Sequence, residues 1–349
     1  MDWNLSAFQP LNAASVVLPA GANMDVTVSM EPESKEAIII QAIQEAKSSI
    51  WAEMYTFTDA NVAGALDKAA QAHIDVRVLY EPRLSQTALQ NLSPDRQQFP
   101  AWAHPNQATL PNKQPVNTRH AKFMVIDGNS AGQAKAYVMT ANFTEQALGG
   151  DPLSTTANRE YVVCDTNAQD IAALMAIFQA DAQGQPLPDL GVSNVIVSTI
   201  NAHSVFFKML SSATRSIWAQ TEEVGDPPSG GVLAQSWNIE AALTTAAKSG
   251  VQVQLMLPPQ NTGSAFIPDS SAALARLSGI LNLQIKTGSR YYMHAKLLVI
   301  DQRIAFVGSE NLARASLNYN REVGLLITSP GEVQKLCATF SSDWSGAPH

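Results

Sequence analysis

The sequence predicts an α/β protein of two homologous α-β-α sandwich halves related by a pseudo-twofold axis. Three observations support this fold class. A motif of the form His-x-Lys-x-x-x-x-Asp occurs twice, the residues around its two copies match, and each copy alternates strand-like with helix-like segments. Such alternation is typical of sheets covered by helices. A chain of 349 residues is long enough to bury a core in each half.

The two motifs span residues 120–127 and 294–301, and they read His-Ala-Lys-Phe-Met-Val-Ile-Asp and His-Ala-Lys-Leu-Leu-Val-Ile-Asp. At ordinary residue frequencies, one chance match in a chain this long has a probability of about a few per cent. Two matches with similar apolar residues inside them therefore indicate an internal duplication.

Each motif predicts a buried strand, because residues 123–126 and 297–300 are apolar and rich in Val and Ile. Residues two apart on a strand share a face, so His120 and Lys122 point the same way, as does the equivalent pair of the second motif. An imidazole beside an ammonium group suits an anionic substrate. The imidazole can attack or transfer a proton, and the ammonium can hold a phosphate oxygen.

The duplication continues on both sides of the motifs. Upstream, residues 49–53 match residues 216–220, and about ten extra residues follow in the second copy. We place this insertion at residues 222–231, where prolines and glycines predict a loop. Downstream, the matching residues are Thr140 and Asn142 with Ser309 and Asn311, and Asn158-Arg159-Glu160 with Asn320-Arg321-Glu322.

The first copy departs from the pattern at Met139, which stands where the second copy has Gly308. A side chain at this position is expected to narrow the pocket or to shift Thr140. The two arginines of the downstream match are expected to form ion pairs rather than to bind phosphate.

The remaining elements follow from periodicity. Apolar spacing predicts helices over residues 35–46, 62–71, 170–180 and 239–248, and strands over residues 75–80 and 251–257. Residues 185–191, with two prolines and a glycine, interrupt all periodicity and predict a linker. The chain is therefore divided into an N-terminal half, 1–185, and a C-terminal half, 186–349.

Charge and hydropathy exclude some classes of protein. A net charge of -8, with no Lys/Arg cluster, argues against a protein that grips nucleic acid by neutralising many phosphates. No apolar run approaches the 18 residues that would predict a transmembrane helix. The first residues show no signal peptide. These features are expected of a soluble protein, either cytoplasmic or a mature secreted form.

From about Met24 to Trp344 the chain resembles the phospholipase D superfamily, in which two HxKxxxxD motifs from homologous halves meet at one active site. Residues 291–322 are similar to bacterial members grouped with cardiolipin synthases. The resemblance implies phosphodiester cleavage through a covalent phosphohistidine, without metal or other cofactor. It also implies that His120 is the nucleophile and His294 the general acid, roles that the residues alone leave open.

The candidate site comprises the residues that match between the two copies. Glutamates are suited to orient a histidine ring, lysines and asparagines to stabilise phosphoryl oxygens, and hydroxyls to add donors. The two motif aspartates are included, although their place at strand ends favours a turn or supporting role. No paired Cys/His set predicts zinc. The catalytic candidates are His120, Lys122, Asp127, His294, Lys296 and Asp301, and the phosphate-binding or orienting candidates are Asn142, Asn311, Ser309, Thr140, Glu160 and Glu322.

The substrate is inferred from the loops expected around the site, which carry Phe99, Trp102, Trp237, Phe266 and Ile267. Aromatic rings at a cleft rim suit a phospholipid at a membrane or micelle surface, although they also suit loops pinned to the protein body. The first hypothesis is therefore a phospholipid headgroup hydrolase or transferase. The alternatives are an endonuclease of the same superfamily and a silent phosphate-binding module, against which the retention of every matched residue argues. A monomer is expected, because the duplication supplies both halves.

Overall fold

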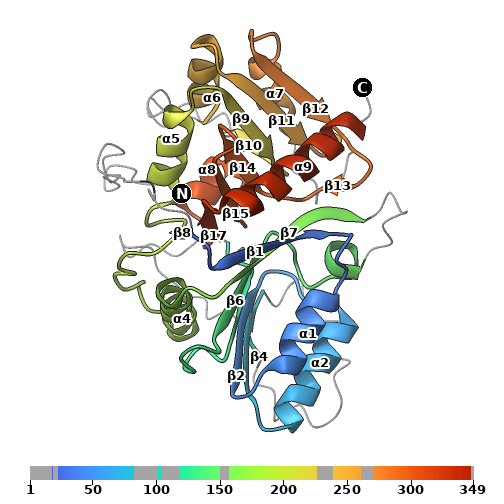
Figure 1. Ribbon diagram of the computed structural model, residues 1–349, viewed down its shortest axis with the longest axis vertical. Helices are drawn as coiled ribbons and strands as arrows, with labels where there is room; N and C mark the ends of the chain where they lie inside the picture. The colour runs from blue at the N-terminus through green and yellow to red at the C-terminus, as the bar shows by residue number, and fades with distance from the viewer. Residues whose placement is uncertain are drawn as a thin grey trace, which may run out of the picture.

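The structure, a computed structural model, describes residues 18, 23–81, 101–103, 118–149, 157–225, 239–260 and 270–346. Its two large β-sheets correspond to the two copies of the repeat (Figure 1). In that view the first copy lies at the bottom and the second at the top, and the long C-terminal helix α9 (Pro330–Gly346) crosses between them. The architecture is thus the two-part α/β fold that the sequence predicts.

The first sheet has the order β1-β7-β6-β5-β2-β3-β4, and β13 of the second copy joins it at β7. Its strands β2 and β3 are parallel, whereas β5 runs antiparallel to β2. The elements are β1 (Val26–Glu31), α1 (Ala37–Glu45), β2 (Ser49–Met54), α2 (Ala60–Gln71), β3 (Asp75–Tyr80), β4 (Ala101–Ala103), β5 (Phe123–Ile126), β6 (Lys135–Met139), the π-helix η4 (Glu145–Gly149), β7 (Asn158–Asp165) and α4 (Ala168–Gln183).

The second sheet has the order β8-β17-β15-β14-β9-β11-β12, which repeats the first sheet strand for strand. Its central pair, β14 and β9, is antiparallel, like β5 and β2. The duplication inferred from sequence is therefore a duplication of topology. The elements are β8 (Val195–Val197), α5 (Ala202–Ser212), β9 (Ser216–Gln220), β10 (Val224–Gly225), α6 (Ile239–Lys248), β11 (Gln252–Leu257), α7 (Ser271–Leu277), β12 (Leu283–Thr287), β13 (Tyr292–Met293), β14 (Leu297–Ile300), β15 (Ile304–Gly308), β16 (Leu312–Ala313), α8 (Arg314–Asn318) and β17 (Val323–Ile327).

Local sequence explains where the predicted helices begin and end. The side chain of Asp59 accepts hydrogen bonds from the backbone N–H groups of residues 61 and 62 and so caps the start of α2. Asn167 caps α4 in the same way, and α4 ends at Gly184, whose left-handed backbone (φ 64°) favours glycine. Residues 185–193 form no helix or strand, as the predicted linker requires. The division of the chain at residue 185 stays a prediction.

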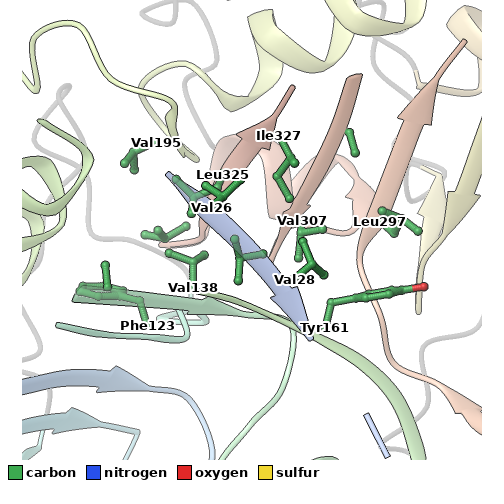
Figure 2. Close-up of a cluster of buried hydrophobic side chains, with 14 of the residues drawn as sticks. Val26, Val28, Phe123, Val138, Tyr161, Val195, Leu297, Val307, Leu325 and Ile327 are labelled. Atoms are coloured by element: carbon green, nitrogen blue, oxygen red, sulfur yellow. The ribbon is translucent and has the colours of Figure 1, made fainter. Parts of the chain in front are cut away.

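A shared apolar core joins the two sheets. Val28, Val138 and Tyr161 of the first copy pack in one buried cluster with Val307 and Leu325 of the second, as Figure 2 shows. The outer faces of the sheets have separate cores, one under α1 and α2 and one under α5, α6 and α7. Because apolar residues of both halves fill the central layer, the halves are held against one another and polar groups at their junction are excluded from water.

The helix that ends each copy packs in this central layer against an equivalent tryptophan. Trp51 of β2 stacks on Phe178 of α4, with ring centroids 5.3 Å apart. Trp218 of β9 stacks on Phe340 of α9, with centroids 5.0 Å apart. The repeated tryptophan therefore fixes the same helix-on-sheet packing twice.

The Met139 expectation is wrong, because this side chain points away from the junction. Met139 is fully buried in the outer core under α1 and α2. At the equivalent Gly308 a Cβ would lie 2.4 Å from Gly324 Cα and 2.7 Å from an oxygen of Glu310. The second copy therefore uses glycine to make room for a buried carboxyl group on its outer side, and the pocket is unaffected.

Part of the predicted insertion also differs from expectation, because Val224 and Gly225 form β10, a strand that pairs with β16. The rest of the insertion and much of the aromatic rim lie outside the described residues, including Phe99, Trp237, Phe266, Ile267 and the side chain of Trp102. None of the helices in the described ranges is long and apolar enough to cross a bilayer.

Candidate active site

Strands β5 and β14 have the predicted bounds, but the His-x-Lys pairs lie in the segments just before these strands and not on them. These segments run along the junction of the two halves. The N–H of His120 donates to the carbonyl of Arg321, and the N–H of Arg321 donates to the carbonyl of Thr118, both at 2.7 Å. The pairing of β13 with β7 holds the other segment in the same way. Backbone hydrogen bonds between halves therefore position both histidines.

Each histidine ring is held by a glutamate of the other half. His120 Nδ1 lies 2.7 Å from Glu322 Oε2, and His294 Nδ1 lies 2.5 Å from Glu160 Oε1. The hydrogen bond expected between a histidine and each matched glutamate is present, and it crosses the junction in both cases. With Nδ1–H donating to a carboxylate, Nε2 is the ring nitrogen left for chemistry.

Both glutamates are fully buried and each receives two further hydrogen bonds, one from a hydroxyl and one from an asparagine amide. Such donors fix the carboxylate and thereby the ring that it holds. The donors are Thr140 (2.5 Å) and Asn158 (3.1 Å) for Glu160, and Ser316 (2.7 Å) and Asn320 (3.0 Å) for Glu322.

The two lysines lie beside the histidines and within electrostatic reach of one another. Lys122 Nζ donates to the carbonyl of His120 at 2.7 Å, and Lys296 Nζ donates to that of His294 at 2.6 Å. Burial and then the charge of Lys296 lower the pKa of Lys122 to about 7. Burial also lowers the pKa of His120 to about 4, although Glu322 opposes it. The ring of His120 is therefore neutral near pH 7, as attack by Nε2 requires.

The asparagines brace the segments that follow β2 and β9. Asn142 Oδ1 accepts from the N–H of Thr56 at 3.2 Å. Asn311 Oδ1 accepts from Thr221 Oγ1 at 3.1 Å and from the N–H of Glu222 at 3.2 Å. The side-chain oxygens are thus used internally, and the NH₂ groups are the donors left for a phosphoryl oxygen.

The hydroxyls expected to contact phosphate lie beneath the site. Thr140 and Ser309 are fully buried. Thr140 orients Glu160, and Ser309 Oγ accepts from the N–H of Val323 at 3.0 Å. Of the two roles expected for these hydroxyls, phosphate binding or orientation, the hydrogen bond of Thr140 to Glu160 is an orienting one. Ser316, which sequence comparison of the copies missed, is the hydroxyl that orients the second glutamate.

Asp127 and Asp301 do not belong to the catalytic group. Each ends its strand, and five residues of extended chain separate Asp127 from Lys122, a span of about 16 Å. Asp127 accepts hydrogen bonds from the N–H groups of residues 47, 48 and 49, and Asp301 from those of residues 214, 215 and 216. Both have left-handed backbones, φ 52° and 53°. They fix the turn before the neighbouring strand, which agrees with the turn or supporting role that their place at the strand ends favours.

Replacing Asp127 by asparagine should accordingly lower stability and leave chemistry intact. The loss of acceptor oxygens for buried N–H groups costs about 1–3 kcal/mol. We expect the free energy of unfolding, measured by urea titration, to fall by that amount, while kcat of the folded fraction stays within about twofold. Asp67, a half-buried residue of α2 that accepts from Gln71, supplies the matched control Asp67→Asn. A large loss of kcat in folded Asp127→Asn would contradict the structural role.

Two site residues were missed because they differ between the copies. Tyr55 and Glu222 occupy equivalent positions, six residues after Ser49 and Ser216. The ring of Tyr55 packs against that of His120, with centroids 4.6 Å apart. Glu222 Oε2 lies 3.1 Å from Lys296 Nζ and 3.5 Å from His294 Nε2. Alignment of the two copies was the available signal, but only identical residues were taken from it, and Glu222 was assigned to the inserted loop.

The arginines next to the glutamates form ion pairs, which confirms that expectation. Arg159 pairs with Glu33 and Asp343, and Arg321 with Asp181. Within the described ranges, no group of three or more His, Cys, Asp or Glu side chains could hold a metal ion. Metal-free chemistry stays a prediction.

Comparison with known proteins agrees with this geometry. The family model described as "Cardiolipin synthase, PLD-like domain" matches residues 39–182 and 206–344, once in each half. A probable cardiolipin synthase of Bacillus subtilis is 24% identical over 87% of this chain and 63% of its own length. Cardiolipin synthase 1 of Staphylococcus epidermidis is 26% identical over 87% of this chain and 64% of its own. The chain thus spans a little under two thirds of the length of these relatives.

Among solved structures, the phosphatidylserine synthase of Haemophilus influenzae is similar in fold, with a TM-score of 0.63 and 15% identity. The similarity covers 92% of this chain and 86% of that one. The matched family model spans most of both halves of this chain. The two His-x-Lys motifs lie within the matched ranges and meet at the junction of the halves. The chain therefore belongs to the phospholipase D superfamily, in the family of cardiolipin-synthase-type phospholipase D-like domains.

Proposed function

We propose that this protein is a phosphodiesterase of phospholipase D type that cleaves or transfers phospholipid headgroups through a covalent phosphohistidine. One observation carries the proposal. Two imidazoles meet at a buried junction, and each is held at Nδ1 by a carboxylate of the other half. This arrangement leaves two Nε2 atoms, one to attack phosphorus and one to exchange a proton.

The reaction has two displacements. In the first, Nε2 of His120 bonds to phosphorus, the bond from phosphorus to the headgroup oxygen breaks, and that oxygen takes the proton from Nε2 of His294. In the second, an alcohol or water gives its proton to His294 and its oxygen bonds to phosphorus. The phosphorus–nitrogen bond then breaks and its electron pair returns to His120. The catalytic groups are thereby restored.

Charge on the phosphoryl oxygens requires donors that are already in place. Lys122, Lys296 and the amides of Asn142 and Asn311 lie around the histidines and supply them. Since burial removes competing water, each donor has a stronger effect than it would at the surface. Both lysine side chains are almost completely buried.

Phospholipid is the favoured substrate because the curated relatives are named as cardiolipin synthases and the chain carries a net charge of -8. An acidic chain is poorly suited to gather the phosphates of a nucleic acid. An endonuclease of the same superfamily is the second candidate, because the same pair of histidines can cleave the phosphodiester bond of a nucleic acid as well as that of a lipid. An alcohol such as the glycerol headgroup of a second phospholipid is the proposed acceptor for transfer.

A substrate panel tests the proposal. Vesicles of phosphatidylglycerol and of phosphatidylcholine, each with and without added glycerol, are compared with single-stranded DNA and RNA at equal phosphodiester concentration. We expect headgroup release or exchange on lipid at least about tenfold faster than nucleic-acid cleavage, with the His120→Asn variant as background. Faster cleavage of DNA or RNA than of any lipid would reject the lipid assignment.

A further inference from the structure

The two halves of the site differ at the pair of equivalent positions beside the two lysines. Tyr55 packs its ring against His120, and Lys122 Nζ lies 5.3 Å from the centre of the same ring. The second half has Glu222 at this position, with a carboxylate oxygen 3.1 Å from Lys296 Nζ. An uncharged ring thus neighbours one His-Lys pair and a carboxylate neighbours the other.

Glu222 is built firmly into the site. It is 8% exposed, and its Oε1 accepts from the hydroxyl of Tyr292 at 2.9 Å. Its N–H donates to the side-chain oxygen of Asn311. Although burial raises the pKa of Glu222, the charges of Lys296 and His294 outweigh burial and lower it to about 2. The carboxylate is therefore ionised throughout the neutral range.

The second oxygen of this carboxylate faces the reactive nitrogen of His294. Glu222 Oε2 lies 3.5 Å from Nε2, while Glu160 Oε1 lies 2.5 Å from Nδ1 on the other side of the ring. A carboxylate accepts hydrogen bonds and cannot donate one, so a ring between two carboxylates is satisfied with a proton on each nitrogen. Lys296 Nζ lies beside this ring, donating to the carbonyl of His294, and the charges of Lys296, His294 and His120 all act on the Glu222 carboxylate.

We propose that Glu222 is a positioning residue that holds a proton on His294 Nε2 until the headgroup oxygen leaves. In this way the difference between Tyr55 and Glu222, and not the duplicated motifs, assigns proton donation to His294 and attack to His120. The inference rests on the proposed function. Glu222 also forms an ion pair with Lys296, so the surroundings of the two lysines are not equivalent.

Leaving-group dependence tests the inference, because only a poor leaving group needs a proton. Glu222→Gln keeps the size of the side chain and an acceptor for Tyr292 but removes the charge. On phosphatidylglycerol, whose leaving group is an alkoxide, kcat should fall about 100-fold or more, the range in which general acid catalysis contributes. On phosphatidyl-p-nitrophenol, whose leaving group departs without a proton, kcat should change less than about threefold.

Three further readouts accompany this comparison. Glu223→Gln alters the neighbouring carboxyl group, which forms no ion pair with His294 or Lys296 in the described part of the chain, and should match wild type on both substrates. Glu222→Asp should recover part of the activity on phosphatidylglycerol. The phosphoryl adduct formed from the nitrophenyl substrate by Glu222→Gln should still be found on His120.

Equal losses on both substrates by a folded Glu222→Gln protein, or no loss on either, would overturn the role given to Glu222 while leaving the proposed function intact. Failure of the folded wild-type protein to turn over either lipid would instead reject the proposed function and the inference with it. Thermal unfolding of each variant shows whether its fold is retained.

Discussion

His120→Asn is expected to lower headgroup release at least about 10⁴-fold, to the level of a site that binds substrate without a nucleophile. The reason is chemical. Asparagine can keep a hydrogen bond to Glu322, but its amide nitrogen has no lone pair available to attack phosphorus. Mass spectrometry of protein quenched during turnover should find a phosphatidyl adduct on His120 of the wild type and none on the variant.

The control is His73→Asn. His73 is exposed and has a left-handed backbone, φ 65°, which asparagine tolerates well. This variant should turn over substrate at the wild-type rate. Two results would contradict the assignment of the nucleophile: a wild-type adduct located on His294, or substantial turnover by folded His120→Asn protein.

Glu322→Gln should slow formation of the adduct on His120 by about 10²–10⁴-fold, although the two residues lie in different halves of the chain. Loss of an equivalent carboxylate in hydrolase triads has an effect of up to about 10⁴. The amide can present an NH₂ group to Nδ1 and so stabilise the ring form whose Nε2 carries the proton, which cannot attack. Single-turnover kinetics with phosphatidyl-p-nitrophenol measures this first step directly.

Glu310→Gln is the matched control, because Glu310 lies near the same strand end and is also buried. Burial raises the pKa of Glu310 well above its ordinary value and so favours the neutral acid, which an amide resembles in size and charge. Adduct formation in Glu310→Gln should stay within about threefold of wild type. If Glu322→Gln formed the adduct as fast as Glu310→Gln, the crossed hydrogen bond would have no part in activating His120.

The repeated residues predicted most of the site, because a residue that occurs at the same position in both copies has the same role in both halves. Strand β3 and helix α6 have the predicted bounds, and both glutamates were recognised as partners for a histidine ring. Which histidine each glutamate would hold was beyond a sequence argument. His120 and Glu322 are 202 residues apart, and His294 and Glu160 are 134 apart. Only the packing of the two sheets brings them into contact.

The aspartates show the opposite case, in which a conspicuous motif position has a purely structural part. The motif places Asp127 five residues after Lys122, at the far end of β5, so strand geometry alone moves it away from the histidine. What it contacts there, the N–H groups before β2, depends on the order of strands in the sheet. The spacing in the sequence therefore predicts that Asp127 lies far from the histidine, but it does not predict which N–H groups Asp127 contacts.

By itself, the sequence determined the duplication, the α/β class and the chemistry-bearing pairs, because strand and helix periodicities and a repeated motif are local properties of the chain. The tertiary structure alone decided how the halves exchange their glutamates and that Tyr55 and Glu222 make two similar His-Lys pairs unequal. Those features arise from contacts between segments more than a hundred residues apart or from the few positions where the copies differ. Burial at the junction then sets the charge of each group, since ionisation depends on the solvent and neighbours that packing provides.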